Sequence, residues 1–214
     1  SYFLTNQALT VVSTVRVFFM SAGFILGNGR SRLVVDLNKL MSIGTVYGCN
    51  GLYRDFTPHC LVATDRPIAD EIQNSGYALK NRFHTRKPIE DLGGKTLQKE
   101  YKGYSSGPNA AGLALVDGHS DIYLIGMDLG TTNGMFNNIY AGTQFYKKEL
   151  DPPTFAGNWV RQVLELCEKF ENRQFYRVEG RESAFIKTFN KIPNMRILAM
   201  DKFLEMVNTC RGPL

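Results

Sequence analysis

The sequence has few of the residues that form metal sites and disulfide bonds. It contains four cysteines and three histidines in 214 residues, and no two cysteines form a Cys-x-x-Cys pair. This wide spacing disfavours a zinc site and a disulfide framework, so we expect free, mostly buried thiols and a cytoplasmic protein. These residues are Cys49, Cys60, Cys167, Cys210, His59, His84 and His119.

The sequence also has no concentrated run of charge. Its formal net charge is +5 and its pI is near 9.0, but the basic residues are spread along the chain and form no tail. This distribution disfavours nucleic acid as a partner and favours an anionic small molecule.

No segment is apolar enough to predict a membrane span. The stretch 9–26 is nearly apolar, but Arg16 and several Ser and Thr residues interrupt it, and 21–26 is needed as a strand. No basic region precedes it, so we expect no signal peptide. We interpret residues 1–19 as an N-terminal appendage or edge segment. The hydrophobic content of 43% suffices for one core, and we expect residues 20–214 to form a single domain.

Short apolar runs alternate with stretches of helical periodicity along the chain. This alternation is typical of a parallel sheet covered by helices on both faces. We therefore predict an α/β fold, a three-layer Rossmann-like domain with a mainly parallel sheet. The predicted strands are 23–26, 44–50, 60–64, 121–128 and 174–178, and the predicted helices are 31–41, 108–118, 158–170 and 201–210.

The first predicted strand ends in a glycine-rich turn, Gly27-Asn28-Gly29. Ligands of parallel sheets bind beyond the carboxyl ends of the strands. We predict that the amides from Gly29 to Ser31, which we expect to be unpaired, bind the phosphate or ribose of a nucleotide together with the Asn28 side chain. A dinucleotide fingerprint would need a third glycine where the chain has Arg32, so NAD is disfavoured. A plain strand-to-helix turn is the alternative.

Several motifs, spread over roughly residues 22 to 198, occur in the order and approximate spacing of a known family. The sequence resembles the bacterial lipooligosaccharide sialyltransferases and the related phage and archaeal proteins that are hydroxymethylpterin pyrophosphokinase-like. The resemblance implies a Rossmann-like sheet with the CMP of a CMP-sugar lying across the strand ends. The motifs are GNGRS (27–31), GCNGLYRDF (48–56), LVATDRP (61–67), YSSGPNAAGLALVDGHSDIYLIGMDLGTTNG (104–134) and VLELCEKFENRQFY (163–176).

The resemblance also implies roles for single residues. Asn28 and Asn50 resemble two asparagines that lie near the nucleotide. Ser106 and Gly107 resemble a Ser-Gly backbone cradle at the start of a helix, and Asp128 resembles an aspartate near the ligand at a strand end. We therefore predict a nucleotide site that these residues form with the glycine turn.

Three family residues have no counterpart in this chain. The sialyltransferases carry two tyrosines after the strand-end aspartate and a histidine base before the next helix. Here the first tyrosine position falls at Gly130 and the histidine position falls near Phe155. Asp65 stands where the sialyltransferases have asparagine and the pyrophosphokinase-like proteins have aspartate. We therefore expect nucleotide binding but not sialyl transfer by the usual route of the family.

Two carboxylates, Asp65 and Asp128, follow predicted strands and are our candidate catalytic residues. Either one can act as the base that activates an acceptor hydroxyl. Alternatively, the pair holds Mg²⁺ against nucleotide phosphates. The structural alternative is that each aspartate accepts backbone hydrogen bonds from a neighbouring loop or helix.

We predict a nucleotide-binding transferase, a sialyltransferase-like glycosyltransferase that uses CMP-sugar or another nucleotide sugar as donor. The alternatives are a Mg²⁺-dependent pyrophosphokinase-like enzyme and a non-catalytic nucleotide-binding protein that lost the catalytic histidine. The sequence does not identify the acceptor.

Two further segments have open interpretations. In 77–88, Lys80, Arg82, His84 and Arg86 alternate as on one face of a strand, which indicates a charged edge strand, a phosphate contact or a nucleic-acid contact. The long loop 130–158 is expected to fold over the crevice, or else to be disordered or form a homo-oligomer contact. The loop side chains that can stack on a base or meet phosphate are Tyr140, Phe145, Tyr146, Lys147 and Lys148.

Overall fold

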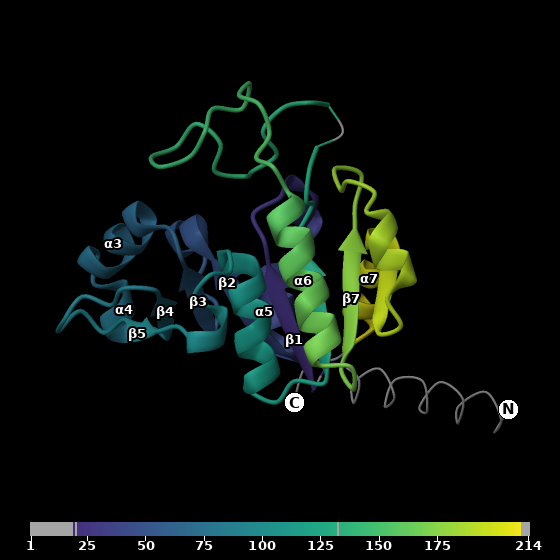
Figure 1. Ribbon diagram of the computed structural model, residues 1–214, viewed down its shortest axis with the longest axis horizontal. Helices are drawn as coiled ribbons and strands as arrows, with labels where there is room; N and C mark the ends of the chain where they lie inside the picture. The colour runs from purple at the N-terminus through teal and green to yellow at the C-terminus, as the bar shows by residue number, and fades with distance from the viewer. Residues whose placement is uncertain (1–18, 20, 132, 211–214) are drawn as a thin grey trace, which may run out of the picture.

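A single parallel sheet organises the chain. The structure is a computed structural model that describes residues 19, 21–131 and 133–210. Within these residues the strands are β1 (Ala22–Leu26), β2 (Thr45–Cys49), β3 (Cys60–Ala63), β4 (Phe83–Thr85), β5 (Lys95–Thr96), β6 (Asp121–Ile125), β7 (Gln174–Glu179) and β8 (Met195–Ala199). They lie in the order β5-β4-β3-β2-β1-β6-β7-β8, and every neighbouring pair is parallel (Figure 1).

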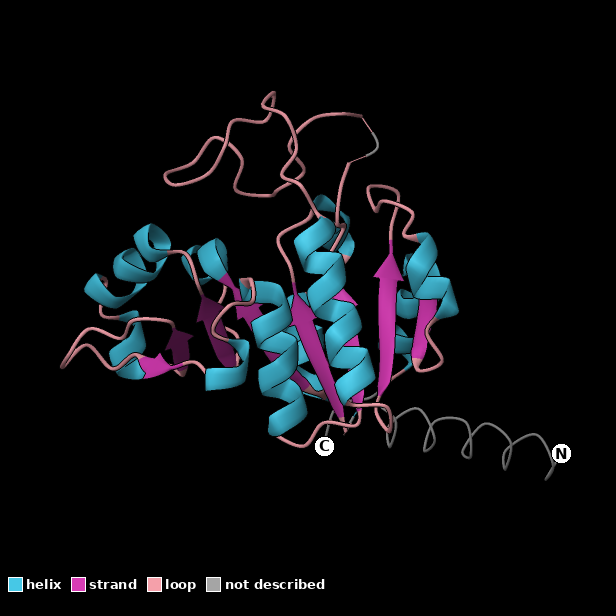
Figure 2. Ribbon diagram, viewed as in Figure 1, coloured by secondary structure: helices cyan, strands magenta, loops and turns pink. Residues whose placement is uncertain are grey.

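Helices cover both faces of this sheet (Figures 1 and 2). On one face pack α5 (Ser106–Val116) and α6 (Gly157–Lys169), and on the other pack α2 (Leu37–Ile43), α3 (Arg66–Asn74) and α7 (Met200–Thr209). The predicted three-layer Rossmann-like fold is confirmed. Shorter helical segments are α4 (Tyr77–Lys80) and the 3₁₀ helices η1 (Arg30–Val34), η2 (Asn50–Arg54), η3 (Lys99–Tyr101) and η4 (Lys187–Lys191).

Strand β1 lies in the interior of the sheet, and all of its residues are buried. Phe24 and Leu26 face the core shared with α2 and α7, whereas Ile25 faces the core shared with α5 and α6. The ring of Phe24 packs edge-on against Phe203 of α7, with centroids 6.2 Å apart. A strand buried on both faces has no polar side, which explains its unbroken apolar run in the sequence.

Most predicted elements are present, with two corrections. The continuous helix predicted over 31–41 is wrong, because Val35 is extended and separates η1 from α2. Asp36 caps α2 by accepting a hydrogen bond from the amide of Lys39 at 3.1 Å, and this local bond starts a new helix. Leu33 and Val34, two apolar residues of the predicted helix, are 66% and 62% exposed.

The charged segment 77–88 is not an edge strand with one charged face. It begins as α4 and continues as β4, which pairs with β3 and β5. The Arg82 guanidinium pairs with Asp117, and the Arg86 guanidinium donates to the carbonyls of Lys102 and Tyr104. Helix α3 and strand β8 were not predicted.

Cys49, Cys60 and Cys167 are buried free thiols, as expected, and Cys210 is also buried. In the described part of the chain, no helix has the length and apolar character needed to cross a membrane. Nearly all of the predicted appendage at 1–19 lies outside the described residues.

An ion-paired cluster joins the start of β4 to the end of α5. Arg82 donates to both carboxylate oxygens of Asp117, at 2.7 and 3.0 Å, and the Tyr47 hydroxyl donates to the same carboxylate at 2.6 Å. Burial alone would raise the pKa of Asp117, but the hydrogen bonds from Arg82 and Tyr47 outweigh it and hold the pKa below its ordinary value. The charged form of Asp117 therefore stabilises the fold.

Replacement of this carboxylate should make stability less dependent on pH. Because the folded-state pKa of Asp117 is lowered, its contribution is present above the ordinary carboxyl pKa and is lost as pH falls through the folded-state value. Asp117→Asn should lower the free energy of unfolding by about 1–3 kcal/mol at neutral pH. The difference from wild type should shrink below about pH 4. Urea denaturation at neutral pH and below about pH 4 measures the free energy of unfolding of both proteins. A difference between variant and wild type that is equal at the two pH values would contradict this role of Asp117.

Candidate functional site

A cavity of about 200 Å³ opens beyond the carboxyl ends of β1, β2, β3 and β6. The chain leaves β1 toward β2 and returns on the other side at β6, so the cavity lies at the switch point where parallel sheets bind ligands. Of the nine residues that the sequence predicted for the site, eight line this cavity and Ser31 does not. The eight are Gly27, Asn28, Gly29, Asn50, Asp65, Ser106, Gly107 and Asp128.

The start of α5 points unpaired donors into the cavity. The amide of Ser105 donates to Gln162 Oε1 at 2.8 Å, but within the described residues the amides of Ser106 and Gly107 have no acceptor. No side chain caps this end of the helix. The first amides of a helix and its dipole together favour an anion. This end of the cavity can therefore bind a phosphate or a carboxylate.

Arg86 adds a positive charge to the same end of the cavity, which it lines. Its guanidinium donates to the carbonyl oxygens of Lys102 at 2.7 Å and Tyr104 at 2.8 Å, directly before the start of α5. These bonds fix the cation beside the free amides. The sequence analysis had left a phosphate contact open for the segment that contains Arg86.

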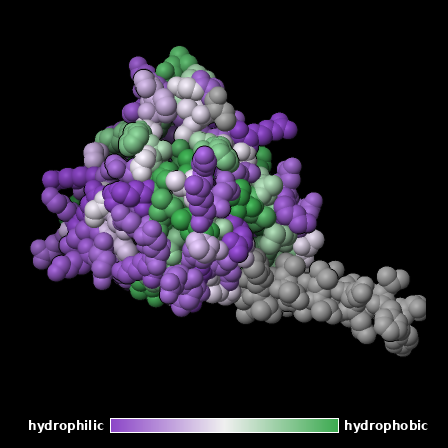
Figure 3. All heavy atoms as spheres, turned by 45° about the vertical axis from the view of Figure 1, so that its right-hand side comes forward, coloured by the Kyte–Doolittle hydropathy of each residue, from purple (hydrophilic) through white to green (hydrophobic). Residues whose placement is uncertain are grey.

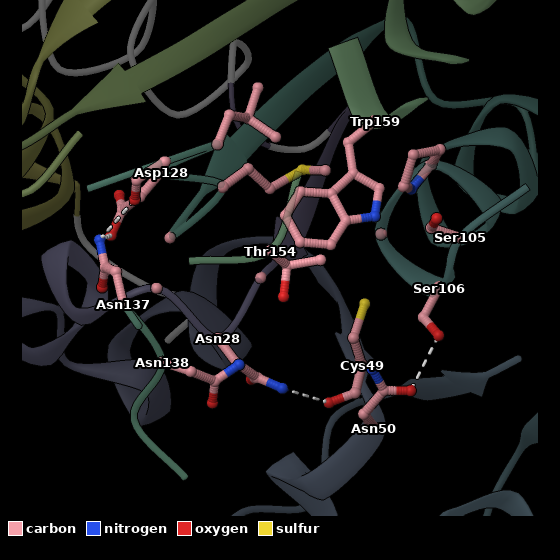
Figure 4. A pocket seen from close by; sticks show the side chains of 18 of the residues that line it. Asn28, Cys49, Asn50, Ser105, Ser106, Asp128, Asn137, Asn138, Thr154 and Trp159 are labelled. Carbon is pink, nitrogen blue, oxygen red and sulfur yellow. Dashed lines mark hydrogen bonds between the residues drawn. The ribbon is translucent and has the colours of Figure 1, made fainter. Parts of the chain in front are cut away.

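A hydrogen-bonded network joins the strand ends along the cavity wall. The Ser106 hydroxyl donates to Asn50 Oδ1 at 2.8 Å and accepts from the amide of Thr64 at 3.0 Å. Asn50 has a φ of 50°, a left-handed conformation that asparagine tolerates better than most residues. Asn28 Nδ2 donates to the carbonyl of Cys49 at 3.0 Å, which ties β1 to β2. Figure 4 shows the Ser106–Asn50 and Asn28–Cys49 contacts on the same wall.

Asp128 forms the opposite wall and is only 4% exposed. One carboxylate oxygen accepts hydrogen bonds from the amide of Ser31 at 3.1 Å and from Asn137 Nδ2 at 3.0 Å. The other accepts from the hydroxyl of Ser183 at 2.9 Å. These hydrogen bonds hold neighbouring loops together. Asp128 therefore has the structural role that the sequence analysis gave as the alternative to catalysis.

The Arg177 side chain of β7 supports Asp128 from beneath. Its guanidinium is fully buried and donates to the carbonyls of Asp128 at 3.0 Å and Ala184 at 2.9 Å. It also pairs with Glu179. Burial lowers the pKa of Arg177, and the charges of Glu179 and Asp128 oppose that shift.

The glycine turn is packed against this wall rather than open to a ligand. The amides of Gly29, Arg30 and Ser31 donate to Gly126 O, Asn137 Oδ1 and Asp128 Oδ2 at 2.8, 2.9 and 3.1 Å. Our expectation that these amides are unpaired is therefore wrong. A Cβ at Gly29 would overlap the Asp128 carboxylate and lie 2.6 Å from Gly126 O. Close packing of two loops explains this glycine.

The two candidate carboxylates differ in availability. Asp65 is exposed, and although it occupies the position before α3, its side chain makes no capping bond. Asp128 is buried and its two oxygens already accept three hydrogen bonds. This pair does not fit the two-carboxylate Mg²⁺ site that we considered. Among the residues that the structure describes, no three His, Cys, Asp or Glu side chains form a metal-binding group.

The segment between β6 and α6 folds over the cavity, as the sequence predicted. Phe136, Asn137 and Asn138 line the cavity, and the amide of Ile139 donates to the Asn28 carbonyl at 2.8 Å. Hydrophobic residues reach the surface at the top of the molecule, where this loop lies (Figure 3), and Leu150 is 82% exposed. Much of the loop's apolar surface is thus unburied.

The loop aromatics that we expected to stack on a ligand do not line the cavity. The amide of Gly51 donates to the Tyr146 hydroxyl at 2.8 Å, and the rings of Tyr146 and Tyr140 lie 5.6 Å apart. These tyrosines fasten the loop to η2. Phe145 is 52% exposed, and Lys147 donates to the carbonyl of Pro152.

Trp159 is the aromatic side chain of α6 that lines the cavity (Figure 4). The sequence analysis predicted this helix over 158–170 but gave Trp159 no place in the site. Its position in the first turn of α6, directly after a long loop, was the available signal. Asn137 was also missed, because no periodicity marks a polar loop residue.

The fold is similar to that of a sialyltransferase. The crystal structure of the monofunctional α-2,3-sialyltransferase Cst-I from Campylobacter jejuni matches with a TM-score of 0.54, 81% of this chain and 80% of that chain being covered. The identity is 14%, so the likeness concerns the fold. It supports the sialyltransferase part of the resemblance and does not extend to the pyrophosphokinase-like part. No protein-family model and no curated protein matches the sequence.

A side chain at Gly29 should destabilise the protein. Gly29→Ala places a methyl group into the Asp128 carboxylate and the Gly126 carbonyl, and we expect a loss of about 1–3 kcal/mol in the free energy of unfolding. Gly103→Ala is the matched control, since a Cβ there has no atom within 4 Å. Thermal denaturation of both variants compares them. If Gly29→Ala has the same melting temperature as wild type, the glycine turn and the loop after β6 are not packed as closely as described.

Proposed function

We propose that the protein is a nucleotide-binding transferase, a glycosyltransferase that takes CMP-sugar or another nucleotide sugar as donor. The observation that carries this proposal is the start of α5, where two amides without an acceptor among the described residues and the Arg86 guanidinium line one cavity at the switch point of the sheet. The fold-level likeness to a sialyltransferase supports it. The donor phosphate binds at Ser106 and Gly107.

The remaining cavity walls suit the other parts of such a donor. Trp159, Met127 and Pro108 form an apolar side on which a base or a sugar ring can stack. Asn50 and Thr64 form a polar side, with hydrogen-bonding groups suited to ribose hydroxyls. An anion-binding end between an apolar and a polar side is an arrangement that suits a nucleotide monophosphate.

Asp65 is our proposed catalytic base. Among the described residues that line the cavity none is a histidine or a tyrosine, and Asp65 is the carboxylate there whose side chain is unbonded. As an acceptor hydroxyl oxygen attacks the anomeric carbon, Asp65 takes its proton and the bond from that carbon to the phosphate oxygen breaks. Asp128 positions the loops around the reacting groups.

Nucleotide binding can be measured through the protein's single tryptophan, Trp159. CMP should change its fluorescence in a saturable way, with the same affinity in the presence and absence of Mg²⁺. Arg86→Gln should weaken CMP binding about tenfold, because it removes a charge beside the phosphate. Arg66→Gln is the matched control, since Arg66 is an exposed side chain that does not line the cavity.

Each other outcome of this titration has a defined meaning. Binding of ATP that requires Mg²⁺ would favour the pyrophosphokinase-like alternative. No response to CMP, CDP, UDP or ATP, checked by calorimetry, would contradict nucleotide binding altogether. If the Arg86→Gln variant and wild type bind CMP with equal affinity, the phosphate does not bind at the start of α5.

Catalysis should depend on Asp65 more than binding does. Asp65→Asn should release CMP from CMP-sialic acid at least about a hundredfold more slowly, since a general base contributes roughly that factor. CMP affinity should change far less than the rate, because asparagine keeps the size of the side chain and only the acceptance of a proton is lost. Chromatographic measurement of free CMP follows the reaction. CMP binding without any release by the wild-type protein would support the non-catalytic alternative.

A further inference from the structure

Asn-Gly dipeptides occur at three places in the sequence, and the structure gives them different surroundings. In such a dipeptide the glycine nitrogen can attack the side-chain amide carbon of the asparagine, because glycine has no Cβ to hinder the approach. Two of the asparagines line the cavity described above, and the third lies in the loop between β6 and α6. The three dipeptides are Asn28-Gly29, Asn50-Gly51 and Asn133-Gly134.

Hydrogen bonds prevent this attack in the first two dipeptides. The amide of Gly29 donates to the Gly126 carbonyl at 2.8 Å, and the amide of Gly51 donates to the Tyr146 hydroxyl at 2.8 Å. Both glycines are buried. A nitrogen held in this way cannot turn toward the preceding side chain, so we expect the asparagine before each of these glycines to be stable.

The third dipeptide is open to the reaction. Asn133 and Gly134 are both exposed, and no described atom lies within 4 Å of the place that a Cβ of Gly134 would occupy. The amide of Gly134 has no acceptor among the described residues. Its nitrogen can therefore move toward the Asn133 side chain without breaking a bond to a described residue.

Two hydrogen-bond donors converge on the side-chain oxygen of Asn133. The Thr131 hydroxyl donates to Oδ1 at 2.6 Å, and the Met135 amide donates to the same atom at 3.1 Å. The Thr131 hydroxyl in turn accepts from the Asn133 amide at 3.3 Å. Negative charge develops on Oδ1 when a nitrogen attacks the adjoining carbon, and donors directed at that oxygen stabilise the transition state.

We propose that Asn133 is a site of spontaneous deamidation, a modification that does not depend on the proposed function. The Gly134 nitrogen forms a bond to Cγ of Asn133, and the bond from Cγ to the side-chain nitrogen breaks. Ammonia leaves with the proton that the Gly134 amide gives up. Water then opens the succinimide ring at one of its two carbonyls, which yields aspartate or isoaspartate.

Peptide mapping by mass spectrometry tests the site in the full-length protein. The protein is aged in mildly alkaline heavy-oxygen water and then digested in ordinary water. The oxygen label should enter at Asn133 at least about tenfold faster than at Asn28 or Asn50, because those glycine nitrogens must first lose a hydrogen bond. In protein unfolded by guanidinium chloride the three sites should react at similar rates. Equal rates in the folded protein would overturn the proposal.

The role of the converging donors is tested by removing one of them. Thr131→Val keeps the shape of the side chain and should slow labelling at Asn133 about threefold to tenfold. Thr57→Val, which changes an exposed threonine in another loop, is the matched control and should leave the rate unchanged. An unchanged rate in Thr131→Val would show that these donors do not promote the reaction.

Deamidation would also place a negative charge where one carboxylate is already unbalanced. Asn133 lines a second cavity, of about 70 Å³, whose charged side chains are Arg30, Glu149 and Glu182. Arg30 and Glu149 form a salt bridge, so the unbalanced charge is that of Glu182. Like charges repel, and the modified loop should therefore be held less tightly.

Hydrogen exchange of the Phe136 amide, which donates to the Glu149 carbonyl at 3.1 Å, measures this loosening. Asn133→Asp should speed the exchange about twofold, whereas Asn133→Gln, which adds no charge, should not. Glu182→Gln added to Asn133→Asp should restore the wild-type rate. Exchange in Asn133→Asp that equals wild type would overturn this effect of the modification on the loop.

Discussion

The hydrogen bonds of Asp128 hold together the loops on which the rest of the site depends. Its carboxylate joins η1 through Ser31, the covering loop through Asn137 and the loop after β7 through Ser183. A buried carboxylate is costly unless such donors surround it, and hydrogen bonds to charged groups contribute about 1.5–3 kcal/mol each. The buried guanidinium of Arg177 secures the backbone of the same residue. Loss of this centre would release three loops at once.

This constraint leaves the two walls of the cavity with different numbers of free hydrogen-bond donors. On the side of β1 and β6 the amides of Gly29, Arg30 and Ser31 already have acceptors, so few groups remain for a ligand. On the side of α5 the amides of Ser106 and Gly107 have none among the described residues. The glycine-rich turn is thus needed for close packing, and the start of α5 supplies the donors.

The sequence predicted the parts of the structure that local patterns control. Buried strands such as β1 and β6 show as apolar runs, and eight of nine predicted site residues line one cavity because parallel strands end at the same edge. The bonding of Asp128 could not be predicted, since its partners Ser31 and Ser183 lie 97 and 55 residues away. The break at Val35 was missed because its helical periodicity continues across the cap at Asp36.

The central claim is that the first amides of α5 bind the phosphate, and an amide-resolved NMR titration with CMP tests it most directly. The account predicts that the Ser106 and Gly107 amide signals shift downfield and saturate together, because both gain a charged acceptor. The amide signals of Gly29 and Ser31 should shift much less, since those donors are already bonded. Saturable shifts centred on Gly29 and Ser31, with Ser106 and Gly107 unmoved, would contradict the account.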